Sequence, residues 1–155
     1  MRYCLLLLAA LLLAACGAKG NDSSSGAATA SAGAGGELTP FQVKNGIGPV
    51  TEEITLGPLD KEMAERGEDI FDLKCGSCHK LDQRYVGPAL GDVLTRRTPT
   101  YVMNMIMAPD TMYTRHPEAR ALLAQYATQM PNLHLSREDA RAIVEHIRKE
   151  AADHD

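Results

Sequence analysis

Two stretches of the chain place hydrophobic residues at the spacing of a helix face. The first contains Met63, Gly67, Ile70 and Phe71 at this spacing. Asp60 precedes them and is suited to cap a first turn, so the pattern predicts a helix from Asp60 through Leu73. A glycine inside a helix costs about 1 kcal/mol relative to alanine, and Gly67 therefore indicates a packing requirement.

The second stretch lies near the C-terminus and has the apolar stripe Ala140, Ile143, Val144 and Ile147. Ser136 and Asp139 stand where a capping box would begin a helix, which is predicted to run to about Glu150. We expect the two helices to cross where Gly67 leaves a notch.

Two shorter helices are predicted between them. One covers residues 100–107, after Pro99, and its side chains are mostly apolar. The other runs from Pro117 to about Tyr126, because proline is favoured in a first helical turn. No stretch alternates convincingly between apolar and polar residues as a strand would, so the predicted fold class is all-α.

Residues 1–15 have the pattern of an export signal. Arg2 is followed by an apolar run from Leu5 to Leu13 that is too short to span a bilayer as a mature helix. The sequence LAAC at 13–16 resembles the end of a bacterial lipoprotein signal. This resemblance implies cleavage after residue 15 and lipid on Cys16, which would anchor the chain to a bacterial membrane on its periplasmic side.

Composition changes twice before the first predicted helix. Residues 16–37 consist mostly of small and polar residues without periodicity, which predicts a flexible tether, although a leader with no spacing role would have the same composition. Residues 38–59 contain two short apolar runs, each ended by a Gly-Pro pair, and are predicted to form an extended arm on a globular body. The body is expected at residues 60–151, followed by a C-terminal tail at 152–155.

The segment Cys75-Gly76-Ser77-Cys78-His79 has the residue types and spacing of a haem c attachment site. Two thiols three positions apart lie on neighbouring sides of one helical turn, where each can form a thioether to a vinyl group of the same porphyrin. The imidazole of His79 can then ligate the iron as the proximal ligand. The predicted cofactor is one covalently bound haem c.

Two other kinds of site contain a Cys-x-x-Cys pair. A zinc site needs further thiolate or imidazole ligands, and the chain has no second such pair. A thioredoxin-like dithiol needs a βαβ setting that the pattern does not predict. With Cys4 removed in the signal and Cys16 bearing lipid, the attachment site uses the other two cysteines and none is left for a disulfide.

Residues 67–149 resemble a class I cytochrome c. The matching features are Gly67 and Phe71 in a first helix, the attachment site, the loop Tyr85-Val86-Gly87-Pro88-Ala89-Leu90, the sequence Met130-Pro131-Asn132 and a final amphipathic helix. The resemblance implies a fold of three to five helices around one haem c. The sequence departs from the family's pattern at His146, because the last helix usually has an aromatic residue there.

The resemblance also implies two roles at the iron. Met130 would be the distal ligand, and the Pro88 carbonyl would accept the other ring N–H of His79 and so orient the ring. Met112 is the rival for the distal position because it also lies in a predicted loop, and His134 would give a bis-histidine alternative. The remaining histidines, expected at the surface or on helix flanks, are His116, His146 and His154.

The chain has a formal net charge of −4 at pH 7, but its basic residues are unevenly placed. Residues 74–115 contain six Lys or Arg and three Asp, a local net charge of +3. In the resembled family this span borders the exposed haem edge, where positive charge would balance the propionates or guide an acidic redox partner. Ordinary solvated surface charge would give the same pattern.

The resemblance implies an electron carrier, not an enzyme. Its partners would be redox proteins, namely a respiratory donor and a terminal reductase or oxidase, with denitrification enzymes such as nitrous-oxide reductase among the candidates. Neither a nucleic acid nor a small-molecule substrate is predicted. Two alternatives are a haem-based sensor or gas-binding module, which needs a labile distal ligand, and a small peroxidase, for which no distal acid–base pair is evident.

Overall fold

A computed structural model describes residues 36–153, and residues 1–35 and 154–155 lie outside its described part. The chain divides into the units 1–33 and 34–155, and the described residues all belong to the second unit. The predicted signal peptide, Cys16, most of the tether and His154 therefore lie outside the described residues. Within residues 36–153, no helix is both long and apolar enough to cross a membrane.

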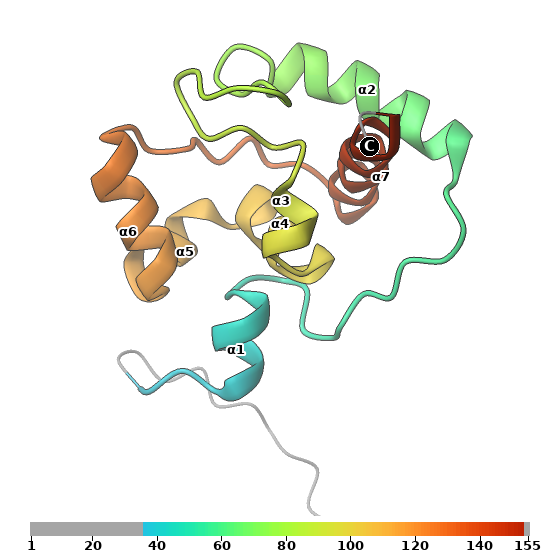
Figure 1. The fold of residues 1–155 in the computed structure, drawn as a ribbon. Coiled ribbons are helices and arrows are strands. Elements are labelled where there is room, and N and C mark those ends of the chain that lie inside the picture. The colour runs from blue at the N-terminus through green and yellow to red at the C-terminus, as the bar shows by residue number, and fades with distance from the viewer. Residues whose placement is uncertain (1–35, 154–155) are drawn as a thin grey trace, which may run out of the picture. The chain divides into compact units, whose positions relative to one another are not determined.

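The described part of the chain consists of helices and connecting segments without a strand (Figure 1), which confirms the all-α prediction. In chain order the helices are α1 (Pro40–Asn45), α2 (Lys61–Lys74), α3 (Val93–Arg96), α4 (Pro99–Met107), α5 (Pro109–Arg115), α6 (Pro117–Tyr126) and α7 (Arg137–Asp153).

All four predicted helices are present as α2, α4, α6 and α7, and each begins at the signal in its sequence. Asp60 caps α2, because its carboxylate accepts a hydrogen bond from the backbone N–H of Met63 at 3.0 Å. Helices α4 and α6 begin at prolines. Before α7, the Ser136 hydroxyl oxygen accepts from the N–H of Asp139 at 3.1 Å, and the Asp139 carboxylate accepts from that hydroxyl at 2.8 Å.

Helices α2 and α7 cross at Gly67, as predicted (Figure 1). A Cβ atom at Gly67 would lie 2.0 Å from the carbonyl oxygen of Ala142 and 3.0 Å from Cβ of His146. Only a residue without a side chain allows the two backbones to come this close. Beside the crossing, the imidazole of His146 packs on the ring of Phe71 with the centroids 5.2 Å apart.

Residues 38–59 are not extended throughout, so that part of the prediction was wrong. Residues 40–45 form α1, which Thr39 caps: its hydroxyl oxygen accepts from the N–H of Gln42 at 3.2 Å, and the Gln42 side-chain oxygen accepts from the N–H of Thr39 at 3.1 Å. Pro40 occupies the first turn. The capping signals are present in the sequence, but six residues are too few to show an apolar stripe.

The segment after α1 is attached to α4 through Asn104, which is fully buried. The Asn104 amide nitrogen donates to the carbonyl oxygens of Asn45 and Val50, both at 3.0 Å, and its side-chain oxygen accepts from the N–H of Val50 at 2.9 Å. A Cβ atom at Gly48 would lie 2.4 Å from the same side-chain oxygen. The main chain of this segment is therefore in direct contact with the Asn104 side chain.

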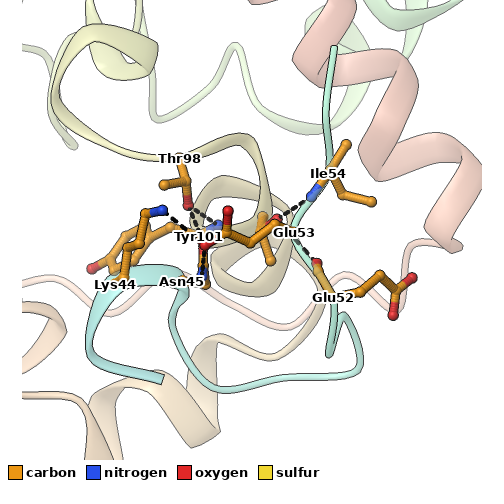
Figure 2. A network of polar contacts seen from close by, with 8 residues as sticks. Lys44, Asn45, Glu52, Glu53, Ile54, Thr98 and Tyr101 are labelled. Carbon is orange, nitrogen blue, oxygen red and sulfur yellow. Dashed lines mark hydrogen bonds and ion pairs between the residues drawn. The ribbon is translucent and has the colours of Figure 1, made fainter. Parts of the chain in front are cut away.

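A second group of polar contacts joins this segment to the first turn of α4 (Figure 2). The Thr98 hydroxyl donates to the side-chain oxygen of Asn45 at 2.7 Å, and the Asn45 amide donates to the carboxylate of Glu53 at 3.2 Å. The Thr100 hydroxyl oxygen accepts from the N–H of Ile54 at 2.8 Å. The start of α4 thus fixes both sides of the turn between α1 and residue 54.

His116 and His146 are buried, which corrects the prediction that they lie at the surface or on helix flanks. Nε2 of His116 donates to the carbonyl oxygen of Val43 at 3.1 Å, and its ring meets Tyr101 edge-to-face at 5.3 Å. The side chains that bury these two rings come from segments distant in the sequence, which residue type alone does not reveal.

Candidate cofactor site

An apolar cavity of about 270 Å³ lies among the turn that follows α2, helices α4 and α7, and the segment between α6 and α7. The predicted site residues Cys75, Cys78, His79, Pro88 and Met130 all line it. Its apolar walls include Val102, Ile106, Ile143 and Ile147.

The two cysteines lie on the turn that ends α2. The N–H of Cys75 donates to the carbonyl oxygen of Phe71 at 2.7 Å, and the N–H groups of Cys78 and His79 both donate to the carbonyl oxygen of Cys75 at 2.9 Å. The chain therefore turns tightly around the Cys75 carbonyl, and both thiols are free. This turn brings the thiols and the imidazole to one wall of the cavity.

The environment of Cys75 argues against a redox dithiol. Burial, and secondly the nearby Cys78, raises the pKa of the Cys75 thiol to about 11. A redox-active cysteine needs the opposite shift, because the thiolate is the reactive form. The pair therefore suits permanent covalent attachment better than thiol exchange.

His79 is oriented by the loop that follows it. Its Nδ1 lies 3.0 Å from the carbonyl oxygen of Pro88. A carbonyl oxygen can only accept, so Nδ1 bears the proton and Nε2 keeps its lone pair. A Cβ atom at Gly87 would lie 2.5 Å from Cε1 of His79, so the ring rests directly on the main chain.

Met130 lies in the segment between α6 and α7, and its backbone is attached to α5. Its N–H donates to the hydroxyl oxygen of Tyr113 at 3.0 Å, and both residues line the cavity. Two non-glycine residues with left-handed backbone flank it, Ala127 with φ of 52° and His134 with φ of 53°. The segment thus turns sharply at both sides of the methionine. Sequence reasoning missed Tyr113, because nothing near it in the sequence indicates this contact.

The rival ligands lie elsewhere. Met112 is fully buried, does not line the cavity, and accepts a hydrogen bond at its sulfur from the N–H of Ile47 at 3.1 Å. His134 is exposed and does not line the cavity either. Among the described methionines, Met105 and Met130 line it, and Met105 does so from within α4.

The donor set fits a haem c group. Cys75 and Cys78 would form the thioethers, while His79 and Met130 would offer a nitrogen and a sulfur to the iron. The cavity is closely packed at His79, where the Gly87 main chain touches the ring. Its other walls are mostly apolar. A bound haem would supply one-electron exchange at this position.

Charged side chains stand around the cavity, but the basic residues are not all free. Arg96 pairs with Asp92 at 2.6 Å, and Arg97 pairs with Glu118 at 3.0 Å. The guanidinium of Arg97 also lies over the ring of Tyr101, 5.1 Å from its centroid. Arg97 is thus partly buried, so the basic residues of this span differ in exposure. Lys80, Arg84 and Arg96 are exposed.

The described residues form a helical body in which a Cys-x-x-Cys-His turn and a methionine line one apolar cavity, and this combination is typical of c-type haem proteins. Residues 64–150 match the cytochrome c family, and the chain belongs to that family. It is a class I cytochrome c, and the family's members bind one haem c covalently and act as electron carriers.

Two groups of similar proteins support this assignment. Cytochrome c2 of Rhodopseudomonas palustris is 35% identical over 54 residues, which are 35% of this chain and 38% of that protein. The solved cytochrome c from Rhodothermus marinus is 42% identical, with a TM-score of 0.69 over 74% of this chain and 99% of its own. An engineered form of it, bound to a carbene intermediate, gives a TM-score of 0.66.

Proposed function

We propose that this chain is a membrane-tethered electron carrier in which Cys75 and Cys78 would hold one haem c covalently and His79 and Met130 would ligate its iron. The observation that carries the proposal is the shared cavity, where two free thiols and an oriented imidazole face the same space as a thioether.

Each residue has a definite task in this proposal. The Pro88 carbonyl oxygen accepts the hydrogen bond from Nδ1 of His79 and so orients the ring. Nε2 would then be available to the iron, and the hydrogen bond would make it a more basic ligand. As a ligand, the thioether of Met130 would favour reduced iron and so raise the reduction potential. The apolar walls would shield the haem from water. Two strong ligands suit repeated single-electron exchange, because a carrier needs little reorganisation between its oxidation states.

The membrane tether rests on the sequence alone. Lipid on Cys16 would hold the domain on the periplasmic side, and residues 16–37 would let it reach its partners. A respiratory donor and a terminal reductase or oxidase are the proposed partners, and nitrous-oxide reductase is one candidate acceptor. The exposed Lys80, Arg84 and Arg96 would attract an acidic docking face.

The absorption spectrum of the oxidised, haem-loaded protein tests the ligand assignment. We expect the far-red charge-transfer band of a methionine–iron bond in the natural protein. The Met130→Ala variant should retain its covalent haem, lose the band and have a lower reduction potential. The control Met112→Ala should keep the band and lose stability, because its buried side chain packs against the arm.

Two results would contradict the assignment. A high-spin spectrum of the natural protein would favour the sensor or gas-binding alternative, since an open distal position is what such a protein needs. If the band disappears in Met112→Ala and persists in Met130→Ala, the distal ligand is Met112 and the assignment of Met130 is wrong.

A separate experiment tests the anchor. The Cys16→Ser variant should move the haem protein from the membrane to the soluble extracytoplasmic fraction without changing its spectrum. Cys4→Ser is the matched control, because Cys4 lies within the predicted signal, and it should stay with the membrane. Continued membrane association of Cys16→Ser would overturn the lipid anchor and leave the haem assignment intact.

A further inference from the structure

The crossing of α2 and α7 brings together three potential metal ligands outside the haem cavity. They are Glu68 of α2 and His146 and Glu150 of α7, and none of them lines the cavity. One ligand atom from each residue lies within 4.8 Å of the other two. His146 and Glu150 are four residues apart, so they lie on the same face of α7.

The imidazole of His146 lacks a hydrogen-bonding partner in this position. The side chain is 3% exposed, and its Nδ1 is buried without a hydrogen bond among the described residues. Buried polar atoms are nearly always paired, because a missing partner costs stability. A phenyl ring would make the same contact with Phe71 and leave no nitrogen unpaired. Packing alone therefore does not account for a histidine here.

The two carboxylates each have an oxygen within 4.8 Å of an imidazole nitrogen of His146, and solvent can reach both carboxylates. The side chains of Glu68 and Glu150 are 47% and 25% exposed. A cation already lies beside them, because Nζ of Lys149 is 3.4 Å from a Glu68 oxygen and 3.8 Å from a Glu150 oxygen. The site thus concentrates negative charge next to a buried imidazole, and Lys149 would compete with any metal ion.

We propose that Glu68, His146 and Glu150 bind a divalent transition-metal ion and thereby clamp α2 to α7. One imidazole nitrogen and two carboxylate oxygens are ligands that Zn²⁺ accepts at about 2.0–2.2 Å. The imidazole favours such an ion over Mg²⁺ or Ca²⁺, which prefer oxygen ligands alone. The two partly exposed glutamates can rotate to close the spacing, and water can occupy the remaining position.

The protonation state of the imidazole agrees with this assignment. Burial lowers the pKa of His146, although the carboxylates of Glu150, Glu68 and Asp72 oppose that shift. A neutral imidazole is the form that binds metals.

Calorimetric titration of Zn²⁺ into the haem-loaded protein, prepared without an affinity tag, tests the proposal. We expect one site per chain, and a thermal midpoint that rises by about 5–10 °C when zinc is present at a hundred times its Kd. His146→Phe keeps an aromatic ring on Phe71 and should abolish the rise. Glu68→Gln and Glu150→Gln should each weaken zinc binding at least tenfold, and Lys149→Met should strengthen it.

Glu65→Gln is the matched control, because it removes an exposed carboxylate from α2 outside the three ligands. It should bind zinc as the natural protein does. The proposal is overturned if zinc does not bind at millimolar concentration, or if all variants bind it equally. Should His146→Phe fail to fold, the two glutamine variants decide, because both side chains are partly exposed and the substitution keeps their shape. The far-red band is measured without zinc. The result of the zinc titration therefore neither supports nor contradicts the electron-carrier proposal.

Discussion

The backbone N–H of Met130 donates a hydrogen bond to the hydroxyl oxygen of Tyr113 across 3.0 Å, and this contact joins the segment after α6 to α5. Because both residues line the cavity, Tyr113 positions the main chain from which the proposed distal ligand extends. The contact spans seventeen residues of sequence, so it depends on the folded arrangement of α5 and α6.

Removing this acceptor should loosen the methionine. Tyr113→Phe keeps the ring but leaves the N–H of Met130 unpaired, which should lower the free energy of unfolding by about 1–2 kcal/mol. The far-red methionine band should also fade at a lower temperature than in the natural protein. Tyr126→Phe is the control, because Tyr126 also lines the cavity and its ring would still support Arg84. If Tyr113→Phe and Tyr126→Phe lose the band at the same temperature, Tyr113 does not position Met130.

A side chain at the helix crossing should be poorly tolerated. Gly67→Ala puts a Cβ atom 2.0 Å from a backbone oxygen of α7, so the helices must separate. We expect a loss of about 3 kcal/mol or more in urea denaturation. Gly57→Ala should change stability by less than about 0.5 kcal/mol, because nothing lies within 4 Å of its Cβ position.

The arm should depend on one buried amide. Asn104→Ala removes the partners of two carbonyl groups and one N–H at Asn45 and Val50. We expect a loss of about 3 kcal/mol and faster protease cleavage within residues 46–59. Asn132→Ala also removes an Asn side chain that accepts a main-chain hydrogen bond, but from a more exposed position, and should cost far less. An unchanged cleavage rate in Asn104→Ala would mean that the contacts in Figure 2 hold the arm alone.

Acid should weaken the start of α7 through Asp139. The hydrogen bond from Arg66, followed by that from Ser136, holds the pKa of Asp139 below its usual range. A lowered folded pKa means that this carboxylate stabilises the fold above its unfolded pKa of about 3.9, and that the contribution is lost as pH falls through the folded value. Asp139→Asn should therefore be less stable than the natural protein at pH 7 and similar to it at the acid end. Glu138→Gln leaves the Arg66 contact intact and serves as the control in urea denaturation across pH.

The exposed basic residues near the cavity should affect rate more than stability. Reversing Lys80 and Arg84 to Glu should change the thermal midpoint little, since exposed charges contribute about 0–1 kcal/mol each. Reduction of an acidic partner should slow by about tenfold at low salt, and the difference should shrink as salt rises. Lys61→Glu is the control, because Lys61 begins α2, whereas the part of α2 that lines the cavity is the opposite end of the helix. If the electron-transfer rate depends on neither the charge reversal nor the salt concentration, these basic residues do not attract the partner. The tether alone would then bring the two proteins together.

Local signals were sufficient for the long helices and for one wall of the site. Helix α2 has a cap, an apolar stripe and a glycine notch, and the Cys-x-x-Cys-His turn follows it directly. Helices α1, α3 and α5 were missed because short helices show no stripe, and α1 depends on distant partners such as Asn104 for its place. His116 is buried where its ring donates a hydrogen bond to the Val43 carbonyl oxygen of α1. No pattern around position 116 reveals this distant partner.

The burial of Cys75 has a consequence for the biosynthesis of the protein. Cys75 is 8% exposed and lies in the same buried cluster as Ile143 and Ile147 of α7, which follow it in the chain and are therefore made after it. We therefore expect the enzyme that joins this thiol to a vinyl group to act before α7 docks. Closing so long a loop is slow relative to forming a local turn, which leaves an interval for that reaction. Changes that stabilise the helix crossing would shorten this interval, so a more stable empty chain should give a lower yield of coloured protein.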